Sequence, residues 1–297
     1  MRHLRNGILL TGAAGFLGYH VARYFRGAGW EVYGLWHEDP PDPASVHRAV
    51  RGDLVAMDAA AMLEDAAADV VVHCAALSGR AQCEADPARA RAVNVEVARR
   101  LAAAAAARNS RFVFVSTDLV FDGARAPYRE GDPVSPLSLY AETKAEAERA
   151  VLAACPEAWV VRTALMYGAG PRGGAGSFLA WTLDALKKGD PLRLYTNQIR
   201  TPLHAPDAAR FIGLLLASNA APGIYHAGGP DRLSRHEIGL RIAAAFRLSA
   251  EHIVPIEVER PHNLGPLDDC SLDCTKAASL GMQFTPFDAG IRSLAQN

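Results

Sequence analysis

Two residues of one predicted helix have the side chains of a proton-transfer pair. Tyr140 and Lys144 lie four residues apart in residues 139–155, whose pattern predicts a helix, so both side chains project from one face. A free tyrosine phenol has a pKa of about 10, and a nearby ammonium can lower it by about 1–3 units. The pair could therefore serve as a general acid and base. The same spacing also occurs in ordinary surface pairs of helices, so it needs supporting features.

A second candidate lies where the strand predicted over residues 111–116 ends. Ser116 and Thr117 carry hydroxyl groups at the carboxyl end of that strand, the edge of a parallel sheet where ligands bind. A hydroxyl there can donate a hydrogen bond to a substrate carbonyl and orient it toward the tyrosine. By itself the pair is better explained as the cap of a strand-end turn.

The third feature is a glycine-rich turn at the start of the chain. An apolar run, residues 8–10, leads directly into Gly12, Gly15 and Gly18, and a helical pattern follows. A strand, a tight turn and a helix N-terminus in this order present backbone N–H groups and the helix dipole to a pyrophosphate. The spacing G-x-x-G-x-x-G is a weak signal when it stands alone, and a turn without ligand is the alternative.

These residues need a sheet that brings strand ends together, and the hydrophobic pattern predicts one. Near-continuous apolar strands alternate with helical segments up to about residue 165, which indicates an α/β fold with a doubly wound parallel (Rossmann) sheet. The expected strands are 8–11, 31–35, a short one near Val50, 69–74, 111–116 and 159–162, and the expected helices are 19–26, 57–67, 87–108 and 139–155.

The alternation weakens after residue 165, which predicts a smaller mixed C-terminal substrate domain. We expect a dinucleotide-binding domain over 1–165, with 202–228 returning to it, and a substrate-binding region over 166–201 and 229–297. Within this part the pattern predicts helices over 178–188 and 206–218 and strands over 192–195 and 223–227. Five glycines in residues 168–176 predict a loop that could fold over a ligand.

Composition excludes several other classes of function. The net charge of −1 gives no electrostatic case for binding nucleic acid or an anionic membrane. Five cysteines without C-x-x-C spacing predict reduced thiols, and the scattered histidines predict no metal site. No targeting segment or membrane-spanning run is visible, so we expect a cytoplasmic protein.

Taken together, the three features resemble the extended short-chain dehydrogenase/reductase family, and within it the dTDP-4-dehydrorhamnose reductase branch. Residues 11–18 match the glycine motif of that family. Residues 115–123, V-S-T-D-L-V-F-D-G, match the branch's V-S-T-D-Y-V-F-D-G except at Leu119. A looser similarity continues through Pro127-Tyr128, Glu130, residues 135–137, Asn197-Gln198, Pro202, residues 223–226, Arg260-Pro261, Leu272-Asp273 and Lys276.

The resemblance implies roles for the matched positions. The implied catalytic residues are Thr117, Tyr140 and Lys144, of which Tyr140 and Lys144 would also contact the cofactor. The other implied cofactor contacts are Gly12, Ala14, Gly15, Phe16 and Leu17 at the turn, Asp53 and Leu54 at the adenine, Cys74, Ala75 and Ala76 at the ribose and diphosphate, and Arg162, Thr163, Ala164 and Leu165 at the nicotinamide. The implied substrate contacts are Thr117, Asp118, Gln198, Arg200 and Arg260, the two arginines being either diphosphate partners or surface residues.

As to function, the resemblance implies an NAD(P)H-dependent reductase of a nucleotide-linked keto-deoxysugar, as in dTDP-rhamnose biosynthesis. A sugar-nucleotide epimerase with the same fold is one alternative. A non-catalytic NADP-binding subunit, like the regulatory subunit of methionine adenosyltransferase, is another. Leu119 in place of tyrosine leaves the identity of the sugar open. A homodimer is the expected assembly if the protein is not a monomer.

The cofactor preference depends on the residue at the end of the second strand. An acidic side chain there binds the ribose hydroxyls of NAD and repels a 2′-phosphate. Counting along residues 31–35 places Trp36 at that position, with His37 next as a possible donor to a phosphate. Neither position holds an arginine. If the strand ended two residues later, the acidic Glu38 would occupy the position that contacts the ribose. We predict a preference for NADP, with NAD as the alternative.

Overall fold

The computed structural model describes residues 6–171, 177–257 and 269–296. Their contacts divide the chain into two compact units, and each is described by itself. The first unit contains the described parts of 1–117, 138–162 and 209–225, and the second those of 118–137, 163–208 and 226–297. Residues 118–137, which the expected boundaries assign to the first domain, belong to the second unit.

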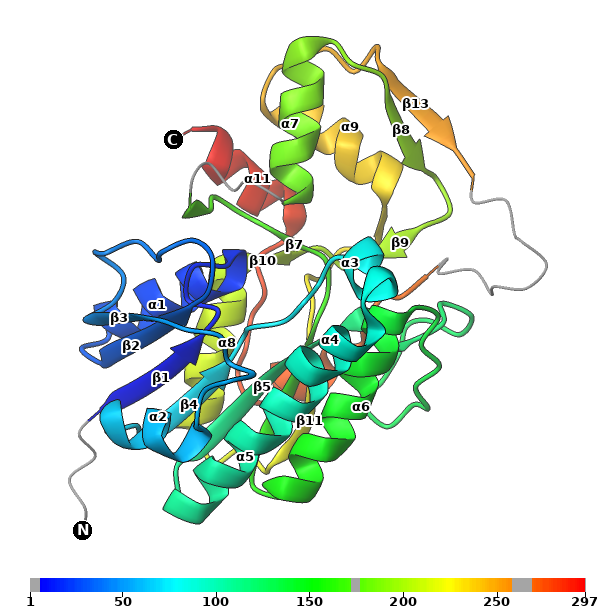
Figure 1. Cartoon of the computed structure of the whole chain (residues 1–297). Helices are drawn as coiled ribbons and strands as arrows, with labels where there is room; N and C mark the ends of the chain where they lie inside the picture. Colours follow the sequence, from blue (N-terminus) through cyan, green and yellow to red (C-terminus); the bar gives the residue numbers. More distant parts are fainter. Residues whose placement is uncertain (1–5, 172–176, 258–268, 297) are drawn as a thin grey trace. The chain divides into compact units, whose positions relative to one another are not determined.

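The first unit is built around a seven-stranded parallel sheet, as the sequence predicts. The strand order is β11-β6-β5-β4-β1-β2-β3, so the direction of winding reverses between β1 and β4 (Figure 1). In this fold class ligands bind at the carboxyl ends of the strands beside such a reversal. The strands are β1 Gly7–Thr11, β2 Glu31–Trp36, β3 Arg48–Arg51, β4 Val70–His73, β5 Arg111–Thr117, β6 Trp159–Thr163 and β11 Gly223–Ala227.

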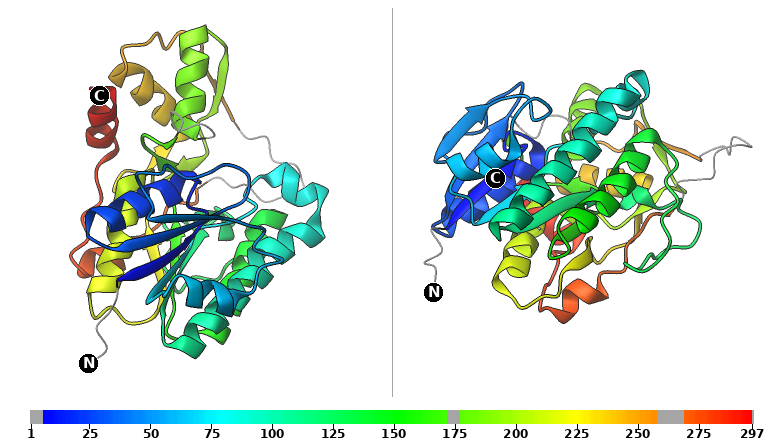
Figure 2. Two further views of the ribbon diagram at one scale, coloured as in Figure 1. Left: turned by 60° about the vertical axis from the view of Figure 1, so that its left-hand side comes forward. Right: turned by 60° about the horizontal axis from the view of Figure 1, so that its bottom comes forward.

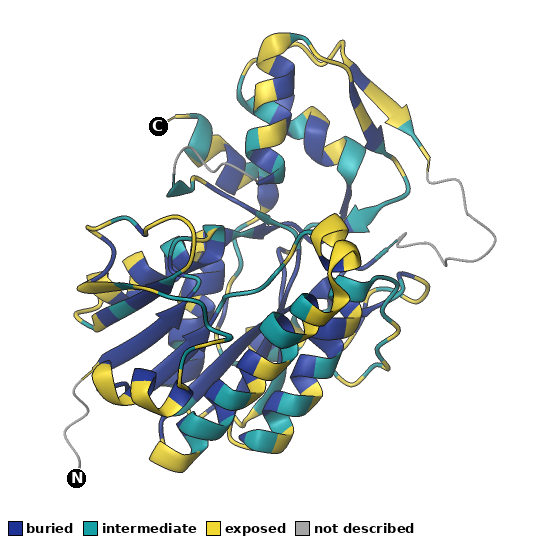
Figure 3. Ribbon diagram, in the orientation of Figure 1, coloured by how far each residue is buried: buried dark blue, intermediate teal, exposed yellow. Residues whose placement is uncertain are grey.

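Helices cover the sheet on both faces because its central strands are apolar on both sides. Every residue of β1 and β4 is buried, and these strands are dark in Figure 3. One face, including Leu9, Val71 and Phe112, packs against α2, α5 and α6 in a single core. Figures 1 and 2 show α1 and α8 over the other face. These helices are α1 Phe16–Gly27, α2 Ala59–Asp65, α5 Val97–Arg108, α6 Leu139–Ala154 and α8 Ala205–Ala217.

The long helix expected over 87–108 is interrupted. It consists of α4 Pro87–Arg91, a π-helical turn η1 over Ala92–Glu96 and α5, and a short helix, α3 Arg80–Ala85, precedes it. The π turn adds one residue per turn, so a pattern of period 3.6 cannot reveal it. Asn94 lies in this turn and is buried. Such turns are frequent at functional sites, which makes Asn94 a residue of interest.

The second unit combines helices with two-stranded sheets around a separate core. Helix α7 Phe178–Lys188 and strand β8 Leu192–Tyr195 have the predicted bounds. The sequence did not resolve the elements after residue 228, because they are short and irregularly spaced. The other elements of the unit are the 3₁₀ turn η2 Asp118–Val120, β7 Met166–Tyr167, β9 Ile199–Arg200, β10 Leu203–His204, β12 Leu233–Ser234, α9 Arg235–Ala245, β13 Ile253–Ile256, α10 Thr275–Ser279 and α11 Phe287–Ala295.

Candidate cofactor and substrate sites

The glycine turn follows β1, and its geometry requires glycine at two positions. Gly12 has φ of +69°, and a Cβ there would lie 2.8 Å from the backbone nitrogen of Ala75. A Cβ on Gly18 would lie 2.0 Å from the carbonyl oxygen of Gly12. A side chain at either position would therefore push the turn away from the loop after β4 or from helix α1.

The first turn of α1 offers backbone donors to an anion. The helix is capped by Gly15, which has no side chain to accept a hydrogen bond from the first N–H groups, and the first turn carries no acidic residue. A pyrophosphate can satisfy these donors and is favoured by the helix dipole. The turn residues Ala14, Phe16 and Leu17 lie at this end of the helix, so the residues present fit a dinucleotide.

The segment after β4 is held against the same turn by a buried hydrogen-bond pair. The hydroxyl of Thr11 lies 2.6 Å from Nδ1 of His73 and accepts a hydrogen bond from the backbone N–H of Ala75 at 3.2 Å. Burial, with a smaller contribution from the charge of Lys144, lowers the pKa of His73 to about 3, so the ring is neutral. This arrangement places residues 74–76 beside the glycine turn, at the reversal of the sheet.

The loop after β3 is also ordered by polar contacts. The Asp53 carboxylate accepts hydrogen bonds from the backbone N–H of Val55 at 3.0 Å and from Arg89 at 2.9 Å. The Val55 bond, with a further contribution from Arg89, holds the pKa of Asp53 below its ordinary value. The carbonyl of Leu54 accepts a bond from Arg100 at 2.8 Å. Asp53 and Leu54 are therefore fixed at the carboxyl end of the sheet.

The Tyr–Lys pair lies at the start of α6, which Ser138 caps. Tyr140 is partly exposed in the first turn, and Lys144 is buried one turn later. The Lys144 ammonium donates to the carbonyl of Val115 at 2.6 Å and lies 3.9 Å from the centre of the Phe114 ring. Burial lowers the pKa of Lys144 to about 7. The lysine thus joins α6 to the carboxyl end of strand β5, two residues before Thr117.

One turn after Lys144, the same face of α6 carries Glu148, which forms a buried ion pair with Arg162. Glu148 accepts two hydrogen bonds from Nε of Arg162, at 3.0 and 3.2 Å, and one from its Nη2 at 2.7 Å. The hydroxyl of Ser116 donates to the same carboxylate at 2.5 Å. The Arg162 side chain, which the resemblance assigns to the nicotinamide site, is therefore bound to Glu148.

Asn94 links three parts of the first unit through its side-chain amide. Its oxygen accepts from the backbone N–H of Leu77 at 2.8 Å, and its nitrogen donates to the Leu77 carbonyl at 3.1 Å and to the hydroxyl of Thr143 at 2.9 Å. Thr143 precedes Lys144 in α6. The π turn thus positions both the loop after β4 and the helix that carries the Tyr–Lys pair.

Two arginines and an aspartate approach one another in the second unit. Nε of Arg200 lies 3.6 Å from a carboxylate oxygen of Asp118, and both side chains are buried. Arg235, the first residue of α9, has its guanidinium 4.7 Å from the centre of the Phe178 ring. Burial, together with the charge of Arg200, lowers the pKa of Arg235 to about 10. Two cations and one carboxylate therefore lie in this cluster.

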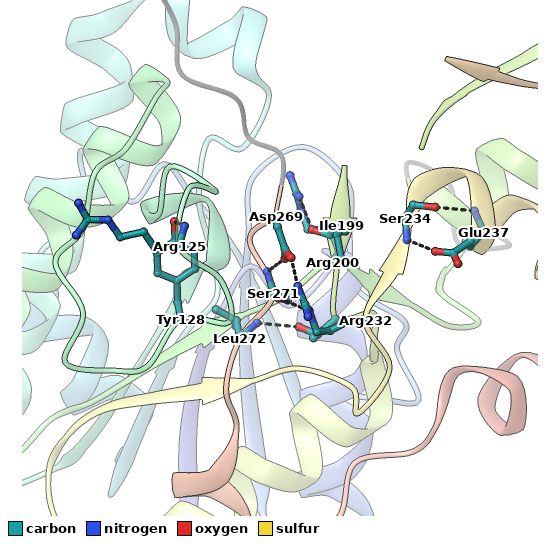
Figure 4. A network of polar contacts seen from close by, with 11 residues as sticks. Arg125, Tyr128, Ile199, Arg200, Arg232, Ser234, Glu237, Asp269, Ser271 and Leu272 are labelled. Carbon is teal, nitrogen blue, oxygen red and sulfur yellow. Dashed lines mark hydrogen bonds and ion pairs between the residues drawn. The ribbon is translucent and has the colours of Figure 1, made fainter. Parts of the chain in front are cut away.

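Neighbouring contacts hold strand β9 and the segment around Ser271 in place (Figure 4). The Arg200 guanidinium donates to the carbonyl of Ile199 at 2.7 Å, and the carbonyl of Gln198 accepts from the backbone N–H of Arg235 at 3.0 Å. Arg232 donates to Ser271 at 3.0 Å and also pairs with Asp269. Arg260, the other arginine expected at the substrate, lies outside the described residues.

Comparison with known proteins identifies the family. A model of the RmlD substrate-binding domain matches residues 6–297, nearly the whole chain. The chain belongs to the RmlD substrate-binding domain family. The expected resemblance to extended short-chain dehydrogenase/reductases of the dTDP-4-dehydrorhamnose reductase type is thereby confirmed.

Curated relatives of this RmlD-family chain differ in what their names describe. The methionine adenosyltransferase 2 subunit beta of Xenopus laevis is 33% identical over 293 residues, covering 96% of this chain and 85% of the relative. The probable low-salt glycan biosynthesis reductase Agl14 of Haloferax volcanii is 32% identical over 258 residues, covering 85% of each. One relative is named as a subunit of a methionine adenosyltransferase and the other as a probable reductase.

Solved structures of similar proteins have the same fold over almost their full length. MoeE5, in complex with UDP-glucuronic acid and NAD, superposes with a TM-score of 0.84 at 26% identity and covers 98% of both chains. A dTDP-4-dehydrorhamnose reductase from Clostridium acetobutylicum gives 0.82 at 25% identity, covering 97% of this chain and 98% of the neighbour.

Some positions of the RmlD-family pattern carry main-chain contacts in this chain. Ala164 donates through its backbone N–H to the carbonyl of Ala227 at 2.9 Å, and the carbonyl of Leu165 accepts from Leu203 at 2.8 Å. Leu119, the departure from the branch motif, lies in the 3₁₀ turn η2. Trp36 ends β2, with exposed His37 following it.

Sequence reasoning missed three residues that the structure places beside the expected ones: Asn94, Glu148 and Arg235. The fractional exposure of Glu148 is 4%, and its position four residues after Lys144, on the same face of the helix, is a signal that could have marked it. The others depend on contacts between residues far apart in the sequence. In the described segments, no group of three or more His, Cys, Asp or Glu side chains is placed to hold a metal ion.

Among the helices of the described segments, none is long and apolar enough to cross a membrane.

Proposed function

We propose that this RmlD-family protein is an NAD(P)H-dependent reductase of a nucleotide-linked keto-deoxysugar. The observation that carries the proposal is the arrangement at the start of α6. Tyr140 and Lys144 share one face of the helix, and the lysine is bonded to β5 just before Thr117. The glycine turn of the same unit supports it, because the helix that follows has no side-chain cap and its first N–H groups fit a pyrophosphate. Agl14, named a probable reductase, and MoeE5, solved with NAD, support the class.

The residues of the first unit divide the chemistry among them. Tyr140 would donate a proton to the carbonyl oxygen as that oxygen gains charge, and the Thr117 hydroxyl would hold the same oxygen by a hydrogen bond. Lys144 would favour the phenolate of Tyr140 after proton transfer and bind a ribose hydroxyl. A bound nicotinamide would supply the hydride. Asn94 and Thr143 would keep α6 in position.

The second unit would supply the substrate contacts. Arg200 and Arg235 are two guanidinium groups in one cluster, and guanidinium groups form paired hydrogen bonds with a phosphate such as the diphosphate of a sugar nucleotide. We assign Gln198 and Arg260 to the same substrate on the sequence resemblance. Leu119 offers no hydroxyl where the related motif has tyrosine, so the proposal leaves the identity of the sugar open.

The test is oxidation of NADPH and NADH, followed at 340 nm, against a panel of 4-keto-6-deoxy nucleotide sugars. We expect turnover with at least one sugar and a loss of at least about 100-fold in the Tyr140→Phe variant, the usual contribution of one general acid. That variant should still bind the cofactor. Turnover at the wild-type rate in Tyr140→Phe would refute the assignment of the acid.

A second function, a non-catalytic NADP-binding subunit, is favoured by the 33% identity to methionine adenosyltransferase 2 subunit beta. It predicts cofactor binding without turnover on any sugar of the panel. It also predicts that adding this protein to a methionine adenosyltransferase catalytic subunit changes the kcat or KM of that enzyme. Turnover of a sugar nucleotide that depends on Tyr140 would decide for the reductase.

A further inference from the structure

An arginine on strand β3 lies beside the end of β2, a contact that the sequence pattern did not predict. Strand β2 ends at Trp36, and its neighbour β3 places Arg51 directly opposite, in parallel register. Residues paired in this way on adjacent parallel strands point to the same side of a sheet. The guanidinium carbon of Arg51 lies 5.4 Å from the centre of the Trp36 ring, within the range of a cation–π contact.

The glycine turn lies close to this strand end. The backbone N–H of Ala13 donates to the carbonyl of Leu35 at 3.2 Å, and a Cβ on Gly34 would lie 2.8 Å from that of Ala13. The turn that fits a pyrophosphate therefore contacts the residue before Trp36. In folds of this kind the adenosine ribose lies beside the end of the second strand, which is the position of Trp36.

Arg51 has the charge state and the freedom to bind an anion there. Its Nε donates to the carbonyl of His37 at 3.2 Å, its side chain is exposed, and among the described residues it forms no ion pair with a carboxylate. Arg48, on the same strand, is by contrast paired with Asp65 at 2.8 Å. The Trp36 side chain carries no charge that would repel a phosphate. The exposed acids Glu38 and Asp39 follow beyond the strand.

We infer that Arg51, held over Trp36, is the residue that binds the 2′-phosphate of a phosphorylated adenosine cofactor and so selects NADP over NAD. The inference rests on the proposed function, because it assumes that the glycine turn binds a dinucleotide. The Arg51 Nε is anchored by His37 and its two terminal nitrogens remain to form the paired hydrogen bonds that guanidinium makes with phosphate. The arginine that would bind the phosphate thus lies on β3 and not among the residues that follow β2.

The experiment measures binding without catalysis. Wild-type protein is titrated calorimetrically with 2′,5′-ADP and with 5′-AMP, which differ only by the 2′-phosphate, and the titrations are repeated with Arg51→Gln. We expect wild type to bind 2′,5′-ADP at least about tenfold more tightly, as a charge-assisted contact to phosphate would give. Arg51→Gln should reduce this ratio to about two or less while its affinity for 5′-AMP stays within about twofold.

Arg48→Gln is the matched control, because it removes the same charge from the same strand. It should keep the wild-type ratio. Arg51→Lys should retain part of the preference, since lysine keeps the charge and loses the paired geometry. The wild-type preference should also shrink as sodium chloride is raised.

Three results would overturn the inference. A preference for 2′,5′-ADP that survives in Arg51→Gln would assign the phosphate to another residue. Equal binding of both nucleotides by wild type would refute selection for NADP and leave the proposed dinucleotide site standing. Binding of neither nucleotide by wild type would refute the dinucleotide site, and the inference with it.

Discussion

Replacing Glu148 by alanine tests the buried ion pair between helix α6 and Arg162. The side chains of Glu148 and Arg162 are only 5% and 3% exposed, and three hydrogen bonds of 2.7–3.2 Å join them. Alanine removes the carboxylate and leaves the Arg162 charge buried, which costs about 3–5 kcal/mol. With a urea slope of about 3 kcal/mol/M, the unfolding midpoint should fall by about 1–1.7 M.

Urea unfolding, followed by tryptophan fluorescence and far-UV circular dichroism, measures this loss. Glu146→Ala is the matched control on the same helix, because Glu146 is 34% exposed and pairs with Arg91 at 3.2 Å. A surface pair of this kind contributes about 0–1 kcal/mol, so its midpoint should shift by about 0.3 M or less. A Glu148→Ala shift no larger than that of the control would refute the reasoning.

The double variant Glu148→Leu, Arg162→Met separates the uncompensated charge from lost packing. Apolar residues of similar volume in place of both partners are often neutral or stabilising. We therefore expect the double variant to unfold within about 1 kcal/mol of wild type. A double variant as unstable as Glu148→Ala would show that the buried arginine charge is not the cause of the loss.

Two further predictions concern the glycine turn and the lysine. Gly12→Ala should lower the free energy of unfolding by about 1–3 kcal/mol and abolish binding of 5′-ADP, because Gly12 has a φ of +69° and a Cβ there would lie 2.8 Å from Ala75. Gly27→Ala is the control and should be neutral or stabilising, because a Cβ there would have no atom within 4 Å. Equal effects of the two substitutions would refute the steric argument. The unfolding free energy of wild type should rise between pH 7 and 8.5, because the unfolded state holds a proton on Lys144 that the folded state, with its pKa lowered to about 7, releases. Lys144→Met should lose about 1–2 kcal/mol of that rise, and an unchanged pH profile would contradict the lowered pKa.

Local sequence determined the elements of the sheet and the positions of its glycine turn and Tyr–Lys pair. An apolar run, three glycines and the i, i+4 spacing of Tyr140 and Lys144 are properties of neighbouring residues, so the strand and helix patterns were sufficient for them. The strand end at Trp36 was found in the same way, and β2 ends there. The catalytic, cofactor and substrate roles of these residues stay predictions.

The tertiary structure decided what surrounds these residues. Arg51 meets Trp36 because β3 pairs with β2 in one particular register, and Glu148 meets Arg162 because α6 packs on β5, the strand next to β6. The π turn at Asn94 and the approach of Arg235 to Arg200 also depend on packing. Charged side chains paired across tens of residues leave no period in the sequence, because their distance is set by the folding of whole elements onto one another and not by the chain between them.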